Sequence, residues 1–290
     1  MLSIEFENDN FDKNEKVLSA HPVSTEVRSA VEAQLAALER EHDVTVLFAC
    51  ESGSRGWGFA SPDSDYDVRF VYVHRLDWYL RVDARRDVIE VPVSDDLDVS
   101  GWELRKALQL MRASNPVLLE WLRSPVVYRE EATWVARLRE LAVLYWSPVR
   151  SYHHYLSMAH KTMKTHLRDG EVVKYKKYFY ALRPLLAARW IRECGTVPPM
   201  RFAELATQLL TDAALVDELN ALLDKKMRAG ESATSAPWKG IHAFLEKELD
   251  AAMRYAPVHV GDRMTADLAN DCLMDAVLHF SERPRCAGVT

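Results

Sequence analysis

The sequence predicts an α+β fold, in which a small mixed β-sheet with flanking helices is followed by an all-helical C-terminal part. Two observations predict this class. Segments rich in β-branched and aromatic residues are confined to the first half of the 290 residues, whereas the second half shows one helical hydrophobic pattern after another. We therefore expect a sheet domain at residues 1–130, with residues 1–20 as an arm. A helical domain at residues 131–290 is expected to close a cleft against it.

The first half contains the segments expected to form the sheet. In order, we expect a helix opened by Pro22 and Ser24, strands at residues 44–52, 67–73, 89–93 and 97–99, and a helix after Glu103. Residues 44–52 are apolar at their centre, which is typical of a buried strand. Pro92 favours an edge position for residues 89–93, because proline donates no hydrogen bond. Ser100 and Glu103 fit an S-x-x-E capping box, and Asn115–Pro116 is expected to stop the helix that follows.

The second half is expected to contain helices and no strand beyond Tyr128. Helical patterns occur at residues 133–144, 149–168, 174–193, 202–209, 213–227 and 241–254. The segment RAGESATSAPWKG, residues 228–240, has the composition of a loop.

Composition excludes several classes of protein. Hydrophobic residues make up 48% of the chain and charged residues 28%, which are ordinary globular values. The formal net charge of −6 excludes a globally basic nucleic-acid coat, and four widely separated cysteines disfavour both a disulfide scaffold and a zinc ribbon. No apolar run reaches the ~18–20 residues that span a bilayer, and the acidic N-terminus does not resemble a signal peptide. We expect a soluble, cytoplasmic protein that does not enter membranes.

The most informative segment is ESGSRGWGFASPDSDYDVRFVY, residues 51–72. Asp65 and Asp67 lie two apart at the entrance of a predicted strand, so their side chains are expected on one face, and Arg69 follows on that face. Parallel carboxylates repel each other unless a cation lies between them, and hard divalent cations prefer carboxylate oxygens. The alternative is a solvated acidic strand end, because an isolated D-x-D is common.

A glycine-rich turn precedes these aspartates. Gly53 and Ser54 follow a buried strand, and Gly56 and Gly58 continue the turn. Such a turn can bring backbone N–H groups close to an anion, and the serine hydroxyl adds a donor. A phosphate site beside a two-carboxylate metal site is the minimum equipment for metal-assisted transfer at phosphorus.

The pattern G-S-x10-D-x-D resembles the signature of the DNA polymerase β-like nucleotidyltransferase superfamily. The longer string ESGSRGWGFASPDSDYDVRF is similar to a narrower group, the RNA-repair-pathway DNA polymerase β family, whose members are associated with RNA ligases. The similarity continues through residues 96–108, 114–128 and 174–190, and so touches both halves of the chain.

The resemblance implies a third carboxylate on a neighbouring strand. We assign this role to Asp98, which lies on the short strand before the helix, with Asp95 and Asp96 as competitors. Together with Asp65 and Asp67 it would hold two Mg²⁺ ions, with Mn²⁺ as an alternative. The resemblance also implies that Gly53 and Ser54 contact the β- and γ-phosphates of a nucleoside triphosphate. An acceptor hydroxyl would then attack the α-phosphate and pyrophosphate would leave.

Basic residues supply further candidate contacts. The expected nucleotide-binding side chains are Arg55, Arg69, Lys177 and Arg183. The last two lie in a segment, residues 160–192, that holds nine Lys or Arg against two acidic residues. Such a segment indicates a patch for triphosphate or RNA backbone, or simply a solvated helix face. Trp57 has two interpretations, stacking on a base or packing beneath the turn.

The sequence therefore predicts a Mg²⁺-dependent nucleotidyltransferase that transfers a nucleoside monophosphate to an RNA end in repair. Its expected partners are a nucleoside triphosphate, RNA and an RNA ligase. Two alternatives remain: the acceptor is a small molecule or a protein hydroxyl, or the chain is a nucleotide- or partner-binding module without turnover. The histidines at residues 153, 154, 160 and 166 do not have zinc-ligand spacing.

Overall fold

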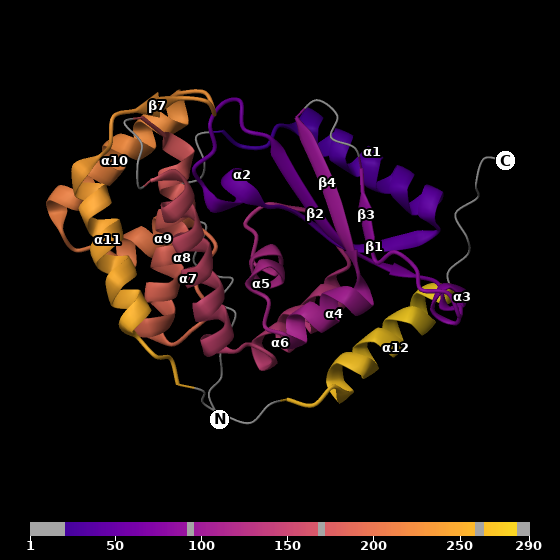
Figure 1. The fold of residues 1–290 in the computed structure, drawn as a ribbon. Helices are drawn as coiled ribbons and strands as arrows, with labels where there is room; N and C mark the ends of the chain where they lie inside the picture. The colour runs from indigo at the N-terminus through magenta and orange to yellow at the C-terminus, as the bar shows by residue number, and fades with distance from the viewer. Residues whose placement is uncertain (1–20, 92–95, 168–171, 259–263, 283–290) are drawn as a thin grey trace.

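The computed structural model describes residues 21–91, 96–167, 172–258 and 264–282. Five strands within them form one mixed sheet in the order β3-β4-β2-β1-β5. Figure 1 shows this sheet with its helices on one side of the molecule and the helices α7 to α11 on the other. The predicted α+β class is confirmed. The expected arm, residues 1–20, lies outside the described residues.

The three inner strands of the sheet are β1 (Val44–Glu51), β2 (Tyr66–His74) and β4 (Leu97–Glu103). Strand β2 pairs antiparallel with β1 and parallel with β4. All of β1 except Thr45 is buried, as its apolar sequence predicts. The outer strands are β3 (Val88–Glu90) and β5 (Val127–Glu130), so the predicted edge position of the third strand is confirmed.

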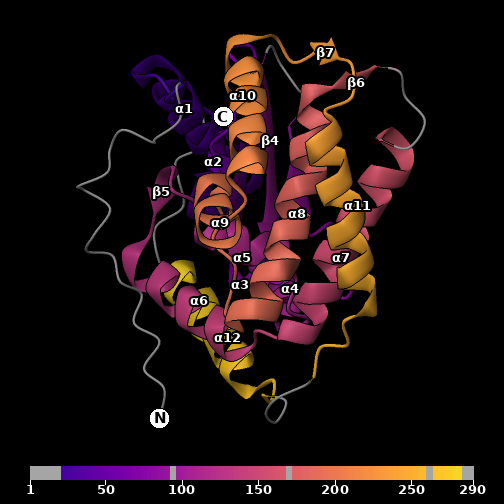
Figure 2. The same ribbon diagram turned by 90° about the vertical axis from the view of Figure 1, so that its left-hand side faces the viewer.

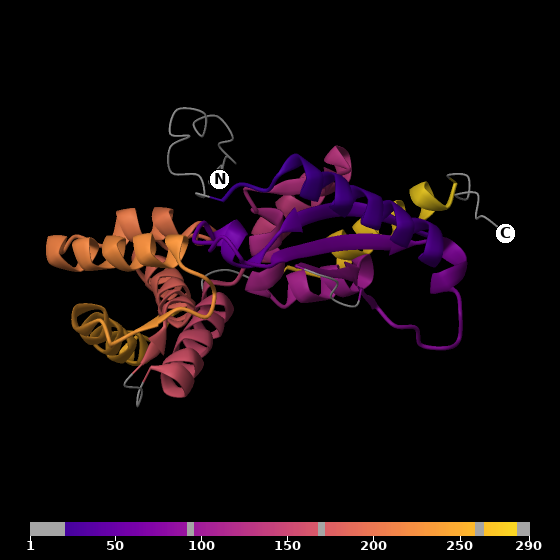
Figure 3. The ribbon, with the colours of Figure 1, turned by 90° about the horizontal axis from the view of Figure 1, so that it is seen from above.

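Helices cover both faces of the sheet. Helix α1 (Thr25–His42) packs Val31, Leu35 and Leu38 against one face, and Ser24 caps it by accepting from the Val27 N–H. The other face is covered by α4 (Leu104–Arg112), α5 (Pro116–Leu122), α6 (Ala132–Leu144) and α12 (Asp267–Ser281). Figure 1 shows the sheet between α1 and these four helices, and Figure 3 shows the same part of the molecule from above.

The remaining helices pack around α8 (Tyr175–Cys194), most of whose apolar side chains are buried. They are α7 (Pro148–His166), α9 (Phe202–Leu209), α10 (Ala213–Arg228) and α11 (Lys239–Arg254), together with a short ladder of β6 (Val173–Lys174) and β7 (Thr234–Ser235). Figure 2 shows α8 between α10 and α11. The predicted helices of the second half are therefore all present. Among the described residues, no helix combines the length and the apolarity needed to cross a bilayer.

Hydrophobic contacts group two late helices with the sheet. Helix α6 packs Val135 and Leu138 into the core formed with β1 and β2, and α12 packs Ala276 and Phe280 into the same core. In the other direction, Phe59, which follows the glycine-rich turn, stacks on Phe179 of α8 with ring centroids 4.9 Å apart. The chain therefore crosses between the two cores more than once. The division at residue 130 stays a prediction.

The capping box expected at Ser100 and Glu103 is wrong. Ser100 lies inside β4, where Val99, Gly101 and Glu103 are buried and alternate with more exposed residues. The N-cap of α4 is Glu103, whose carboxylate accepts from the Arg105 and Lys106 N–H groups. Burial alternates with a period of two over residues 97–103, which is typical of a strand, so this segment is a strand despite its local S-x-x-E pattern.

The expectation of no strand beyond Tyr128 is also wrong. Strand β5, which is four residues long, pairs with β1, and β6 and β7 add two residues each. These strands are too short to show an alternating pattern, and β5 is only partly buried. The glycine-rich turn also differs from expectation, because residues 53–57 form a short helix, α2 (Gly53–Trp57). A second short helix, α3 (Leu76–Tyr79), follows β2.

The packing of α12 against the sheet predicts different effects for two neighbouring side chains. Phe280 is 2% exposed and Leu278 is 48% exposed. We expect Phe280→Ala to lower the free energy of unfolding by about 3–5 kcal/mol, because a buried aromatic side chain leaves a cavity. Leu278→Ala should change it by less than about 0.5 kcal/mol. Urea denaturation followed by circular dichroism measures both, and equal losses would contradict this placement of α12.

Candidate functional site

The glycine-rich turn and the D-x-D pair are in direct contact. Gly53 has φ +60°, and a Cβ placed on it would lie 1.9 Å from Oδ2 of Asp67. The Ser52 N–H donates to the backbone carbonyl of Asp67 at 2.8 Å. Glycine suits this position for two reasons: a φ of +60° strains other residues, and a Cβ would displace the Asp67 carboxylate. The structure thus brings together the two halves of the G-S-x10-D-x-D pattern.

Asp98 is the directly neighbouring residue of Asp67 across the parallel pair β2–β4. Its competitor Asp96 is exposed, and its backbone carbonyl accepts from the Tyr66 N–H at 2.7 Å. The second competitor, Asp95, lies outside the described residues. Asp65 immediately precedes β2 and is exposed. The sheet therefore places Asp98 beside Asp67, as expected for a third carboxylate.

The charges of these aspartates act on one another. Burial raises the pKa of Asp67, the guanidinium of Arg69 opposes this shift, and the charges of Asp98 and Asp65 add to it. A partly desolvated carboxylate such as Asp67, with further negative charges beside it, favours a cation.

Arg69 lies between two of the carboxylates. Its Nη2 donates to Asp67 Oδ1 at 3.0 Å and to Asp98 Oδ2 at 2.7 Å. Its Nη1 donates to the backbone carbonyls of Asp98 at 2.8 Å and of Val68 at 3.0 Å. The residue predicted to bind nucleotide is thus engaged with the acidic residues themselves.

Glu51 holds the backbone of Asp67 through a hydrogen bond, and the sequence argument did not assign Glu51 a role. The side chain is completely buried. Its Oε1 accepts from the Asp67 N–H at 2.9 Å, and its Oε2 accepts from the Tyr128 hydroxyl at 2.5 Å. Burial raises the pKa of Glu51 to about 7. The available signal was a charged residue at the end of an otherwise apolar strand.

Helix α8 approaches the acidic residues from the helical part of the molecule. Burial, then the charges of Glu231, Asp67 and Asp65, raise the pKa of Tyr180 to about 12. The Nζ of Lys177 lies 5.6 Å from the centre of the Tyr180 ring. Burial and the neighbouring Lys176 and Lys174 lower the pKa of Lys177. Among the described residues, no carboxylate pairs with Lys177, which leaves its charge available near the site.

A polar cluster anchors the loop that leads to Asp65. Lys226 is 1% exposed, and its Nζ donates to Ser61 Oγ at 2.5 Å and to Glu231 Oε1 at 2.7 Å. Ser64 also donates to Glu231, and Lys176 pairs with Glu231 at 3.1 Å. Although burial opposes the shift, bonds from Lys226 and Ser64 lower the pKa of Glu231 to about 2. Sequence reasoning missed this cluster because its members are far apart in the chain.

Arg55, a predicted nucleotide contact, is 5% exposed. Its guanidinium donates to the backbone carbonyls of Ser64 at 2.5 Å and Asp65 at 3.3 Å, and lies 3.9 Å from the centre of the Tyr66 ring. These contacts hold the loop between α2 and β2. They leave the proposed phosphate contact of Arg55 without structural support.

Arg183, the other buried candidate, is 2% exposed. It pairs with Glu120 of α5 at 2.9 Å and donates to the Met200 carbonyl at 3.1 Å. Its guanidinium lies 4.7 Å from the centre of the Trp57 ring, and the Trp57 indole N–H donates to Glu120 at 3.3 Å. The packing interpretation of Trp57 is therefore the one that the structure supports. A nucleotide contact by Arg183 is not supported, because its guanidinium is enclosed by these partners.

The donor set suits a hard divalent cation, which prefers carboxylate oxygens. Oδ2 of Asp67 accepts no hydrogen bond from the described residues and faces the space that a Cβ on Gly53 would fill. Within the described ranges, no group of three or more His, Cys, Asp or Glu side chains has an arrangement that could hold a metal ion. At the acidic residues, Arg69 supplies the positive charge instead.

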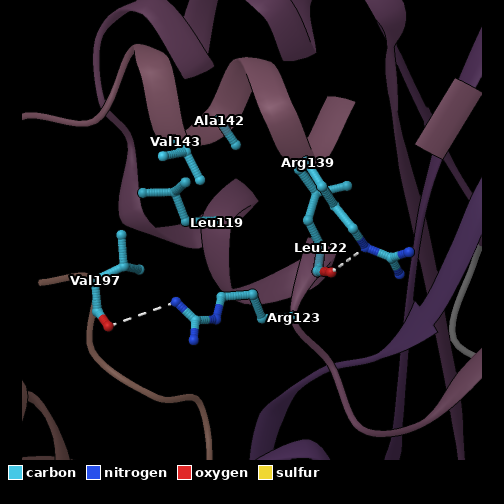
Figure 4. Close-up of a pocket in the computed structure, with 7 residues that line it drawn as sticks. All are labelled: Leu119, Leu122, Arg123, Arg139, Ala142, Val143 and Val197. Carbon is cyan, nitrogen blue, oxygen red and sulfur yellow. Dashed lines mark hydrogen bonds between the residues drawn. The ribbon is translucent and has the colours of Figure 1, made fainter. Parts of the chain in front are cut away.

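A small apolar pocket lies elsewhere, between α5, α6 and the chain around Val197 (Figure 4). Its lining residues are Leu119, Leu122, Arg123, Arg139, Ala142, Val143 and Val197. Arg139 donates to the Leu122 carbonyl at 3.0 Å and pairs with Glu130 at 2.8 Å. None of the predicted site residues lines this pocket.

Comparison with known proteins gives a family and two similar proteins. Residues 27–275 match the RNA repair pathway DNA polymerase beta family. The chain is 45% identical over 246 residues to the uncharacterized protein YcgL of Bacillus subtilis (strain 168), covering 84% of this chain and 94% of that protein. A solved structure, a nucleotidyltransferase-like protein from Exiguobacterium sibiricum 255-15, is 12% identical with a TM-score of 0.30, covering 90% of this chain and 82% of that one.

The family match confirms the resemblance found in residues 51–70. It extends from helix α1 into helix α12 and includes the Gly-Ser turn, the D-x-D pair and Asp98. The chain therefore belongs to the RNA repair pathway DNA polymerase beta family.

Proposed function

We propose that the chain transfers a nucleoside monophosphate from a nucleoside triphosphate to an acceptor hydroxyl, and that the acceptor is an RNA end. The hydroxyl oxygen bonds to the α-phosphorus while the bond to pyrophosphate breaks. Asp65, Asp67 and Asp98 hold Mg²⁺, with Mn²⁺ as a substitute, and form the catalytic group.

One observation supports this proposal most directly. Gly53 lies against Oδ2 of Asp67, and Asp98 is the residue beside Asp67 on the adjacent strand. The turn suited to phosphate and the residues suited to a cation therefore occupy one place. Neither feature alone would favour transfer at phosphorus, but their contact does.

The surrounding residues have distinct tasks in this proposal. Mg²⁺ bound by the aspartates would neutralise phosphate charge and lower the pKa of the attacking hydroxyl. Ser54 follows Gly53 in α2, whose N-cap Ser52 makes no side-chain hydrogen bond to the helix. The first turn of α2 can therefore donate to the terminal phosphates. Glu51 holds the backbone of Asp67 in place, which positions the carboxylate rather than reacting with substrate.

Two observations support RNA as the acceptor: the description of the family and the presence of lysines without carboxylate partners. The family is described as part of an RNA repair pathway. Lys174 and Lys177 have no carboxylate partner among the described residues. Lys177 lies over the ring of Tyr180, whose pKa is raised by burial and by the charges of Glu231, Asp67 and Asp65. Unpaired positive charge beside an acidic centre suits a polyanion whose end must reach that centre.

An assay with α-labelled nucleoside triphosphates tests the activity and the acceptor together. The protein is incubated with Mg²⁺ or Mn²⁺ and structured RNA, and the reaction is repeated without RNA. Label on RNA is the expected result. Label on the protein or on an added small molecule would contradict the proposed acceptor, and nucleotide binding without label transfer would contradict turnover.

We expect Asp67→Asn and Asp98→Asn each to lower the transfer rate by at least about 100-fold, because each removes a charged ligand for the cation. Asp96→Asn is the matched control, since Asp96 lies two residues from Asp98 on the exposed side of the chain. It should retain the wild-type rate. If all three variants lose the same amount of transfer rate while their circular dichroism spectra are unchanged, the assignment of Asp98 rather than Asp96 to the site would be contradicted.

Lys177→Gln should raise the KM for nucleoside triphosphate about tenfold with little change in kcat, because a charged contact to phosphate binds ground state and transition state alike. Lys164→Gln, which removes an exposed charge from α7, is the control and should leave KM unchanged. Steady-state kinetics at fixed ionic strength separates the two. A loss of kcat at unchanged KM would assign Lys177 a different task.

A further inference from the structure

We propose that Arg69 is a resident counter-ion of the acidic site, so that the protein without nucleotide binds one divalent cation rather than two. This inference rests on the proposed function, because it concerns the cations that Asp65, Asp67 and Asp98 would hold. The second cation enters only when Arg69 gives up its bridge between Asp67 and Asp98.

The position of the guanidinium leads to this proposal. One nitrogen, Nη2, lies 3.0 Å from Asp67 Oδ1 and 2.7 Å from Asp98 Oδ2. These are the two carboxylates that a shared second cation would have to join. Nη1 adds a bond to the Asp98 carbonyl at 2.8 Å, so the side chain is fixed on both the backbone and the carboxylate of Asp98. A guanidinium held by several charge-assisted bonds is strongly oriented.

Partial burial strengthens the electrostatic interaction between Arg69 and the two carboxylates. The Arg69 side chain is 19% exposed and that of Asp67 is 30% exposed. Water therefore screens their interaction less than it would at an open surface. A divalent cation cannot occupy the position between Oδ1 of Asp67 and Oδ2 of Asp98, because Nη2 of Arg69 already lies there. A cation and Arg69 are thus alternative partners of these two oxygens.

One place for a cation remains beside this bridge. Asp67 uses Oδ1 for Arg69, whereas its Oδ2 faces Gly53 and accepts no hydrogen bond from the described residues. Asp65 is exposed and lies two residues before Asp67, at the entrance of β2. Oδ2 of Asp67 and the carboxylate of Asp65 therefore form the place for the single cation in the protein without nucleotide.

Nucleotide offers Arg69 another partner. A phosphate group presents several anionic oxygens, and arginine binds phosphate as readily as carboxylate. When the guanidinium turns to a phosphate, Asp98 and Oδ1 of Asp67 become free for the second cation. An exchange of partners explains how Arg69 can bridge Asp67 and Asp98 in this structure and still bind nucleotide, as the sequence predicted.

Electron paramagnetic resonance of free Mn²⁺ in a titration of nucleotide-free protein tests the proposal without any turnover. We expect about one Mn²⁺ per wild-type chain and about two per chain of Arg69→Gln, because glutamine has no charge to exclude the second ion. The double variant Arg69→Gln/Asp98→Asn should return to about one. Circular dichroism confirms that each variant is folded.

Two single variants keep the test decisive if Arg69→Gln does not fold. Asp98→Asn in the wild-type background should leave Mn²⁺ uptake unchanged, because Arg69 already occupies Asp98. Asp67→Asn should weaken uptake at least about tenfold.

Two Mn²⁺ in the wild-type protein, or equal uptake by wild type and a folded Arg69→Gln variant, would overturn the role of Arg69. So would a loss of uptake in Asp98→Asn. Absence of Mn²⁺ uptake in every variant, wild type included, would instead contradict the proposed function, so the two failures are distinguishable.

Discussion

The contact between the backbone of Gly53 and the carboxylate of Asp67 is the constraint on which the site depends. A Cβ at residue 53 would lie 1.9 Å from Oδ2 of Asp67. The chain therefore needs glycine where β1 turns toward β2. The parallel pairing of β2 and β4 then places Asp98 beside Asp67. The positive φ of Gly53 and the pairing of Asp67 with Asp98 are set by the backbone, whereas the close approach to Gly53 also depends on the conformation of the Asp67 side chain.

Charge balance is the second requirement of this region. Asp65, Asp98 and Glu231 all act on Asp67, which is itself partly desolvated. Their mutual repulsion would oppose folding without nearby positive groups. Arg69 bridges Asp67 and Asp98, and two lysines, Lys176 and Lys226, pair with Glu231. Among the described residues, no basic side chain pairs with Asp65, so negative charge remains around Asp65 and Asp67.

The sequence predicted the fold class and the inner strands, because apolar runs report on the backbone. The position of Asp98 on a strand beside Asp67 was implied by the family resemblance, with Asp95 and Asp96 as competitors. The sequence could not separate basic residues that look alike. Arg183 and Lys177 lie in the same basic segment, yet Arg183 is enclosed by Glu120 and Trp57 whereas Lys177 has no carboxylate partner among the described residues. Long-range pairs such as Lys226 with Glu231 and Ser61 also leave no local pattern. Strand β5 escaped detection because four half-exposed residues show no period.

Two buried clusters determine how the helical part is attached to the site. Glu120 joins Trp57 of α2, Arg183 of α8 and Tyr155 of α7, the last through a 2.7 Å hydrogen bond. Lys226 and Glu231 join the loop before Asp65 to the end of α10. Removing one partner of a buried ion pair costs about 3–5 kcal/mol, because the other charge stays buried. Both clusters contact segments that flank the acidic residues, one at α2 and one at the loop into β2. The helical part therefore supports the turn and the aspartates, and moving it away from them would require these buried ion pairs to break.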